Sequence, residues 1–214
     1  RIDQLGAKER LALSFRHMND DPQNHIRVIP PLLRREVTLH EPYSGDYIHG
    51  YMVNAGFSEN VMKWHRQHPG IPLRFFWDKW EEEPVKRVDN TLSFYQLDDV
   101  EFLRQMAGCK AYASTAGFES VCEAMYLGKP ILMVPAHIEQ DCNAYDAEKS
   151  GAGIISSDFN LQQLLEFAKD YHPNRDFVYW VRGAEYTLLN LLESDSSNYQ
   201  QVLFNEMYLV EEFI

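Results

Sequence analysis

From about residue 46 onward, short apolar runs alternate with polar stretches in which apolar residues recur at helical spacing. Apolar runs of about 4–8 residues bounded by Gly, Pro, Asn or Asp are typical of buried strands. The predicted strands are Tyr47–Val53, Pro72–Trp77, Thr91–Tyr95, Lys110–Ser114, Lys129–Pro135 and Gly153–Ser156, and the predicted helices are Ser58–His68, Asp98–Ala107, Ser120–Leu127, Gln140–Ser150, 160–171 and 175–193. This alternation indicates βαβ units and predicts an α/β fold, with a Rossmann-like, doubly wound parallel sheet of about six strands.

The two ends of the chain do not follow this alternation. The residues Lys8–His17 predict one short helix, and the Pro30-Pro31 pair predicts an extended segment, because proline lacks an N–H and disfavours a helix before it. We therefore interpret residues 1–36 as an N-terminal helix and connector, and residues 37–193 as the Rossmann-like domain. Residues 194–214 are predicted to form a linker and a C-terminal helix.

Composition narrows the class of protein. The chain has 214 residues with 20 Lys+Arg against 32 Asp+Glu, and a net charge of −12 disfavours nucleic acid as a partner. No apolar run approaches the roughly 20 residues of a membrane span, and peripheral membrane association of the full protein is left open. The three cysteines, Cys109, Cys122 and Cys142, form no CxxC motif and no Cys/His cluster, which predicts neither disulfides nor a zinc site, and we therefore expect a cytoplasmic protein. We recognise no signal peptide in the sequence. Because it starts at Arg1 and not at Met, we expect a fragment of a longer protein.

Ligands of an open parallel sheet bind beyond the carboxyl ends of its strands, near the point where the strand order reverses. The loop after the first predicted strand, Asn54-Ala-Gly56, lacks the GxGxxG of a dinucleotide site. The chain also has no Walker P-loop and no GxSxG nucleophile elbow. That strand ends in Val53-Asn54 and not in an acidic pair, which disfavours a phospho-receiver domain.

The most informative segment lies between the fourth predicted strand and the helix that follows it. Ala116 and Gly117 allow an anion to approach the backbone, and Thr115 and Ser120 add hydroxyl donors. The free N–H groups and the positive end of the helix suit a diphosphate, while Glu123 can accept hydrogen bonds from vicinal hydroxyls such as those of a ribose. The alternative is structural, because Ser120-x-x-Glu123 also has the spacing of a capping box.

The wider arrangement resembles the donor-binding domain of GT-B glycosyltransferases, especially the MurG and UDP-glycosyltransferase-like group with its family 28 C-terminal domains. The shared pattern is a strand, G-x-x-S/T-x-x-E, G-x-P, a strand that ends in Pro, and an acidic/Gln pair followed by Asn-Ala. In this chain those positions are Gly117, Ser120, Glu123, Gly128, Pro130, Pro135, Glu139-Gln140 and Asn143-Ala144. The resemblance covers about residues 37–192 and is densest over 94–153.

The resemblance implies a role for each matching position. It implies diphosphate binding by Thr115, Ala116, Gly117 and Ser120 together with Asn54 and Gly56, ribose binding by Glu123, base binding by Phe94, Tyr95 and Gln96, and sugar binding by His137, Glu139, Gln140 and Asn143. Two positions depart from the family pattern. Thr115 stands where many relatives place a His, and the first loop is poorer in glycine than that of MurG.

These observations predict the C-terminal donor domain of a glycosyltransferase that transfers a hexosyl group from a nucleoside-diphosphate sugar, with a UDP-sugar expected. The resemblance implies no metal and no other cofactor, and it places the general base in an N-terminal acceptor-binding domain that this chain lacks. We therefore expect the chain alone to bind a nucleoside diphosphate and to transfer no sugar.

Two other functions stay open. A sugar-nucleotide 2-epimerase of the same fold would use Glu123, Glu139 and His137 as catalytic groups, and a non-catalytic nucleotide-sugar-binding module would use none. His137 could equally be an ordinary loop residue. His65-x-x-His68 places two imidazoles on one helical face but offers no third ligand, so we do not predict a metal site there.

Overall fold

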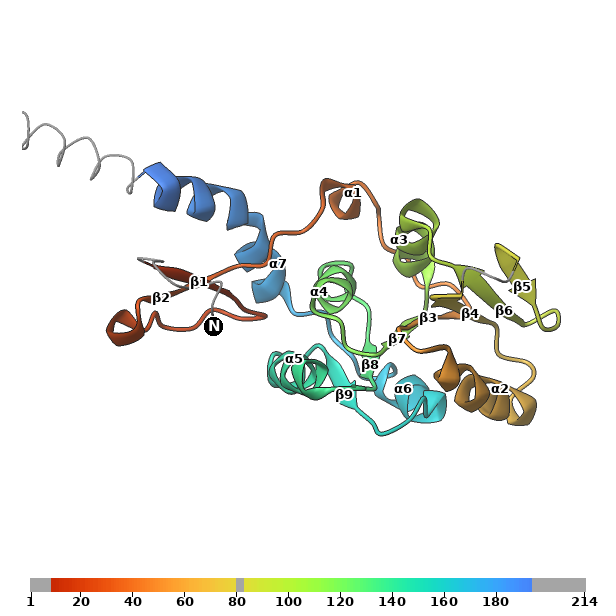
Figure 1. Ribbon diagram of the computed structural model, residues 1–214. Coiled ribbons are helices and arrows are strands. Elements are labelled where there is room, and N and C mark those ends of the chain that lie inside the picture. Colours follow the sequence, from red (N-terminus) through yellow and green to blue (C-terminus); the bar gives the residue numbers. More distant parts are fainter. Residues whose placement is uncertain (1–8, 80–82, 194–214) are drawn as a thin grey trace, which may run out of the picture. The chain divides into compact units, whose positions relative to one another are not determined.

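The computed structural model describes residues 9–79 and 83–193, shown in colour in Figure 1. The linker and C-terminal helix predicted after residue 193 lie outside the described residues. The described chain forms two compact units: one runs Leu33–Val178, and the other combines the residues up to Leu32 with those from Tyr179 onward.

The larger unit is built on a sheet that, within the described residues, has seven strands in the order β5-β6-β4-β3-β7-β8-β9. The strands are β3 (Ile48–Met52), β4 (Leu73–Trp77), β5 (Val85–Arg87), β6 (Leu92–Gln96), β7 (Ala111–Ser114), β8 (Ile131–Met133) and β9 (Gly153–Ile155). All neighbours pair in parallel except β5, which runs antiparallel to β6 at the edge. Numbered along the chain, the parallel strands of this described sheet follow the Rossmann order 3-2-1-4-5-6. The predicted fold class is confirmed.

The edge strand β5 is not among the predicted strands. All of its residues are exposed, so its sequence carries no apolar run that would mark a strand. Its backbone pairs with β6 in the register Val85↔Tyr95 and Arg87↔Ser93. A short, charged strand of this kind is a common way to end a sheet without exposing a flat apolar edge.

The helices predicted between the strands of the larger unit are present, and a short helix before β3 is not among the predicted ones (Figure 1). They are α1 (Arg35–Thr38), α2 (Ser58–Gln67), α3 (Asp99–Gly108), α4 (Phe118–Tyr126), α5 (Ile138–Lys149), α6 (Leu161–Phe167) and the first part of α7 (Arg175–Arg182). Several begin at a side-chain cap. Asp98 accepts from the N–H of Glu101 at the start of α3, and Asn160 accepts from the N–H of Gln163 at the start of α6.

The core of the larger unit lies on the faces of the central strands. One cluster contains Ile48, Phe75 and Leu92 from neighbouring strands, all fully or almost fully buried. Gly50 on β3 is required by this packing, because a Cβ at that position would lie 2.2 Å from the ring of Phe75. The central strands are thus held close enough to fix the relative positions of the loops that follow them.

His49 on β3 is completely buried among aromatic rings. Its imidazole stacks on Tyr112 and lies edge-on to Phe76 and Phe102, with ring centroids 4.7 to 5.3 Å away. Burial, aided by the charge of Arg74, lowers the pKa of His49 to about 3, so the ring is neutral at physiological pH.

The smaller unit contains the strands β1 (Arg10–Leu13) and β2 (Ile26–Ile29), which pair in parallel in the register Arg10↔Ile26. The helix predicted over Lys8–His17 is therefore wrong over its described part. Leu, Ala, Arg and Glu favour a helix locally, but the backbone of this segment hydrogen-bonds to a partner strand more than a dozen residues away. In the same unit, the indole N–H of Trp180 donates to the carbonyl of Ser14 at 3.2 Å.

The extended conformation predicted for the Pro30-Pro31 segment agrees with the structure, which shows strand β2 up to Ile29 and no helix until Arg35. Helix α7 continues after a single turn residue into a second helical stretch over 184–193. None of the described helices has the length and apolar character needed to cross a bilayer.

Candidate functional site

The strand order reverses between β3 and β7, so the loops after these two strands border the crevice in which ligands of this fold bind. Strand β3 is followed by the loop that contains Asn54 and Gly56, and β7 is followed by the turn Thr115–Gly117. The backbone N–H of Val53 donates to Oγ1 of Thr115 at 3.4 Å, which joins the two loops. The structure thus brings together two segments that the sequence predicted to serve one diphosphate.

The turn after β7 is sharply folded at Ala116. This residue has φ +60°, in the left-handed region that favours glycine, and it is completely buried. Its N–H donates to Oγ of Ser114 at 3.1 Å, and its carbonyl accepts from Nδ2 of Asn143 at 3.4 Å. These hydrogen bonds stabilise the left-handed conformation of Ala116, which links strand β7 directly to helix α4.

The N-terminus of α4 is open. Gly117 is the N-cap, and within the described chain no side chain caps the helix. Ser120 lies at the third helical position and its hydroxyl donates to the carbonyl of Gly117 at 3.2 Å. The capping-box alternative is therefore wrong, because the box requires the serine itself to be the N-cap. The N–H groups of the first turn keep no intrahelical acceptor and carry the positive end of the helix dipole.

Gly117 is not required by the fold. Its φ of −64° and ψ of 133° are accessible to any residue, and a Cβ there would meet nothing closer than Oγ of Ser120 at 3.7 Å. Gly50, in contrast, is required by the fold, because a Cβ at that position would clash with the ring of Phe75. Neither the backbone conformation nor the neighbouring atoms require a glycine at position 117. A glycine there lets a ligand approach the backbone N–H groups at the N-terminus of the helix closely.

In the loop after β3, Asn54 is the N-cap of the short 3-10 helix η3 (Ala55–Phe57). Its side chain accepts from the N–H of Gly56 at 2.8 Å, and both residues are exposed. The loop is therefore shaped by its own hydrogen bond and lies at the surface next to the turn after β7.

Glu123 forms an ion pair with Arg34, a residue that the sequence did not suggest. Nε of Arg34 lies 2.6 Å from Oε1 of Glu123 and Nη2 lies 3.1 Å from Oε2, so the guanidinium grips both carboxylate oxygens. The Glu123 side chain is only 5% exposed. Burial raises the pKa of Glu123, and the hydrogen bonds and positive charge of Arg34 oppose that rise.

Helix α5 carries the residues predicted to bind the sugar. His137 is its N-cap and Glu139 lies in its first turn, and both are exposed. Gln140 is buried and its Oε1 accepts from the N–H of Ala136 at 2.8 Å, which leaves the amide NH₂ as its free end. Because Asn143 donates to the carbonyl of Ala116, the start of α5 lies beside the turn after β7.

Strand β6 carries the residues predicted to line the base. Phe94 is 1% exposed and stacks on Trp77 with centroids 4.5 Å apart, so its ring belongs to the core. Tyr95 points to the other face of the sheet, is half-buried, and stacks on Phe76. Gln96 is half-buried at the carboxyl end of the strand. Alternation along a strand explains the difference, because neighbouring side chains point to opposite faces.

His65 on α2 and His68 at the C-cap of this helix are engaged in structural contacts. Nε2 of His65 lies 2.7 Å from Oδ2 of Asp89, and His68 stacks on Trp64. The residues that the structure describes contain no group of three or more His, Cys, Asp or Glu arranged to hold a metal ion.

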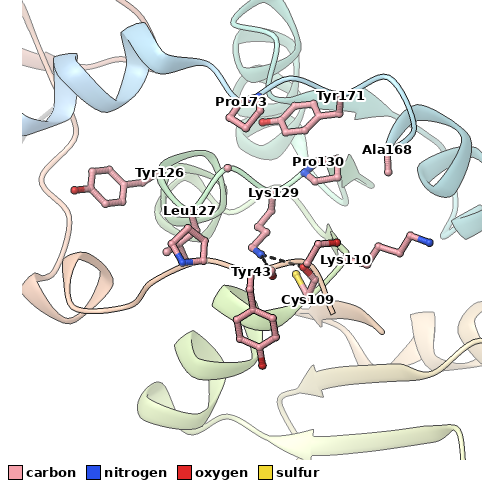
Figure 2. A pocket seen from close by; sticks show the side chains of 13 residues that line it. Tyr43, Cys109, Lys110, Tyr126, Leu127, Lys129, Pro130, Ala168, Tyr171 and Pro173 are labelled. Carbon is pink, nitrogen blue, oxygen red and sulfur yellow. Dashed lines mark hydrogen bonds between the residues drawn. The ribbon is translucent and has the colours of Figure 1, made fainter. Parts of the chain in front are cut away.

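A cavity of about 500 Å³ lies on the opposite, amino edge of the sheet (Figure 2). Nζ of Lys129 donates there to the carbonyls of Tyr43 at 2.7 Å and Cys109 at 3.0 Å. Cys109 is the C-cap of α3, so the ammonium neutralises a helix C-terminus. This contact accounts for the buried cation without a ligand.

The structure thus has a Rossmann-like sheet, and the helix after β7 begins at Gly117, beside the point where the strand order reverses. The family model described as Glycosyl transferase family 1 matches residues 6–171. Because this match covers well over half of the chain, the protein belongs to that family. The resemblance to a GT-B glycosyltransferase-like domain is confirmed.

Individual proteins show the same relationship. A Caenorhabditis elegans protein named as a UDP-glucuronosyltransferase, ugt-48, is 26% identical over 105 residues, which cover 48% of this chain and 20% of that protein. The glycotransferase of kitacinnamycin shares the fold with a TM-score of 0.61 and 14% identity, over 87% of this chain and 54% of that one. Arabidopsis thaliana UGT89C1, solved with quercetin, gives a TM-score of 0.56 and 15% identity, over 80% and 51%. The chain spans about half the length of these solved structures and a fifth of the C. elegans protein.

Proposed function

We propose that this chain is the donor-binding part of a nucleotide-sugar-dependent glycosyltransferase, and that the diphosphate of the donor binds at the turn Thr115–Gly117 and the N-terminus of α4. Membership of a glycosyltransferase family supports the reaction class. The observation that carries the position of the site is Gly117, a glycine that the backbone does not need, at a helix end that no described side chain caps.

The diphosphate would bind through local dipoles. The protein has a net charge of −12, so its overall field repels an anion and the attraction must come from the α4 N–H groups. Thr115 is completely buried and its hydroxyl accepts from Val53, so it would hold the turn in place from within. Ser120 would turn its hydroxyl away from the Gly117 carbonyl toward the phosphate oxygens.

The position of the diphosphate determines where the ribose, the base and the sugar of the donor would bind. The Glu123 carboxylate would accept hydrogen bonds from the ribose, and Tyr95 and Gln96 would contact the base, with Phe94 supporting the strand from the core. On the other side, α5 would present His137, Glu139 and the amide NH₂ of Gln140 to the sugar. The relative named as a UDP-glucuronosyltransferase favours a uridine base.

In the proposed reaction, an acceptor oxygen forms a bond to the anomeric carbon while the bond from that carbon to the diphosphate oxygen breaks. The electron pair of the broken bond goes to the nucleoside diphosphate, which leaves with increased negative charge. The N–H groups at the start of α4, which no described side chain caps, would be oriented toward this charge and would stabilise the leaving group without reorganisation. The acceptor loses its proton to a general base, which we place in an N-terminal domain outside this chain.

Gly117→Ala tests the site. A Cβ there meets only ordinary contacts, so the variant should fold with equal stability or gain about 0.4–1 kcal/mol through a less flexible unfolded chain. The same methyl group would block close approach of a phosphate, and we expect the affinity for UDP to fall at least about tenfold. Isothermal titration with UDP, GDP and dTDP, alongside thermal unfolding, measures both quantities.

Gly70→Ala is the matched control. Gly70 is an exposed glycine whose Cβ would meet nothing within 4 Å, and its substitution should leave UDP binding unchanged. Unaltered UDP affinity in Gly117→Ala would place the diphosphate elsewhere. A wild-type chain that binds none of the three nucleotides would refute the proposed function. An epimerase and a binding module share the nucleotide site, and a transfer assay on the full-length protein separates them from a transferase.

A further inference from the structure

The geometry of the Arg34–Glu123 contact bears on ligand binding as well as on stability. Arg34 is the residue immediately before α1, in an extended conformation with φ −63° and ψ 144°. Its Nε and Nη2 bind the two oxygens of Glu123, while Nη1 lies 3.3 Å from Oδ1 of Asp99 on α3. Three separate segments of the larger unit therefore meet at one guanidinium, whose plane is fixed by contacts on both sides.

The fork leaves Glu123 able to accept two further hydrogen bonds. An ionised carboxylate has about four lone-pair sites, two on each oxygen, and a bidentate guanidinium occupies one site per oxygen. One site on each oxygen remains, on the side turned away from the guanidinium. These two outer sites point in different directions, so a ribose hydroxyl would bind one of them. A carboxylate gripped in this way cannot rotate, so the remaining sites point in fixed directions.

Without Arg34 this carboxylate would take up a proton more readily. Glu123 is 95% buried by its side-chain surface, and the neighbouring acids Glu119 and Asp99 add negative charge to its surroundings. Its buried neighbours on β7 and α4, Tyr112 and Cys122, have raised pKa values and stay neutral, so they supply no countercharge. A protonated Glu123 would present one hydroxyl in place of a charged acceptor, which weakens its bonds to donor hydroxyls.

We propose that Arg34 is a positioning residue for the donor ribose: it holds Glu123 charged and in a fixed orientation, so that a free site on the carboxylate faces a ribose hydroxyl. The inference rests on the proposed function, since it assigns the ribose to Glu123. It adds a residue from the segment before α1, outside every motif of the resemblance. Arg34 does not touch the donor itself and acts only through Glu123.

The test compares UDP with 2′,3′-dideoxy-UDP, because the ratio of their dissociation constants isolates the ribose hydroxyls from the base and the diphosphate. In the wild-type chain we expect UDP to bind at least about tenfold more tightly. In Arg34→Met, which keeps side-chain length but loses the charge and the fork, UDP should bind as weakly as the dideoxy analogue. Glu123→Gln should behave in the same way, and Arg34→Lys, with a charge but no fork, should retain only part of the ratio.

Arg35→Met is the matched control. Arg35 adjoins Arg34 and has an exposed side chain, so its substitution should leave the ratio at the wild-type value. The pH profile provides a second readout that a purely structural role would not produce. The wild-type ratio should be constant from pH 6 to 8, whereas in Arg34→Met it should recover as the pH rises and Glu123 loses its proton.

The outcomes are separable. A wild-type ratio in Arg34→Met, or tighter UDP binding than in the wild-type chain, would overturn the inference and show that Arg34 is neutral or covers the carboxylate. If Arg34→Met fails to fold, the ratio measured for Arg34→Lys takes its place: a reduced ratio supports the inference, and a wild-type ratio overturns it. A wild-type chain that binds UDP with a ratio of one would remove the ribose from Glu123, and a chain that binds no nucleotide would refute the proposed function itself.

Discussion

Arg34 and Glu123 lie 89 positions apart in the sequence, yet Nε of Arg34 is 2.6 Å from Oε1 of Glu123. The contact joins the segment before α1 to the helix that begins at the proposed diphosphate site. A buried carboxylate thus depends on a cation supplied by a distant part of the larger unit. Its consequences can be measured in the stability of the protein as well as in ligand binding.

Arg34→Met should destabilise the protein more at pH 8 than at pH 5. Burial already raises the pKa of Glu123, and removal of Arg34 raises it further, above the value in the unfolded chain. An acid with a raised folded-state pKa contributes stability at low pH, and this stability is lost as the pH rises through that pKa. We expect a loss of about 3 kcal/mol at pH 8 from the unpaired buried charge, and a clearly smaller loss at pH 5. Urea unfolding at both pH values measures this, and an equal loss would contradict it.

The residues at the start of α5 should separate sugar recognition from folding. Glu139→Ala removes an exposed side chain and should weaken binding of a UDP-sugar more than binding of UDP, with little change in stability. Gln140→Ala should do the same but also cost about 1–2 kcal/mol, because the N–H of Ala136 loses its acceptor. Calorimetric titration of each variant with UDP and with a panel of UDP-sugars tests this pair. Equal losses for both kinds of ligand would place these residues away from the sugar.

His49→Leu should make the protein less sensitive to acid. His49 has its pKa lowered to about 3 in the folded protein, so between pH 6.5 and 3 the unfolded chain takes up a proton that the folded protein cannot. The wild-type protein should therefore lose about 2 kcal/mol from this residue between pH 7 and pH 5. Asp89, whose pKa is lowered mainly by its bond to His65, adds its loss only at lower pH and remains in both proteins. Parallel stability curves for the two proteins would rule out this role for His49.

The chain as it stands should bind UDP and transfer no sugar. The proposed diphosphate contacts come from Thr115–Gly117 and α4 inside the larger unit, whereas the general base is proposed to lie elsewhere. Binding should weaken with added salt despite the net charge of −12, because the local field at the helix end provides the attraction. Titration at two salt concentrations beside a transfer assay checks both statements. Robust transfer by this chain would show that it contains the base, and His137 and Glu139 would be examined first.

The sequence alone determined the fold class, and it predicted where the candidate site lies. Apolar runs such as those around β3 and β7 are local features, and six such runs separated by helices leave few arrangements besides a parallel, doubly wound sheet. The small residues Ala116 and Gly117 after β7 were equally visible, because a turn that admits an anion requires small side chains wherever it occurs. These predictions needed no knowledge of distant contacts.

The tertiary structure decided everything that depends on pairing between distant segments. Residues 10–13 have the composition of a helix but form β1, because β2 offers a ladder of hydrogen bonds that local propensity cannot anticipate. Phe94 has the chemistry of a base-stacking residue but packs against Trp77, because the face on which a strand residue lies is set by the sheet around it. Arg34 has no motif of its own. Its role follows only from the fold that brings its guanidinium to a buried carboxylate, since the strength of that pairing depends on burial, and burial is a property of the folded chain.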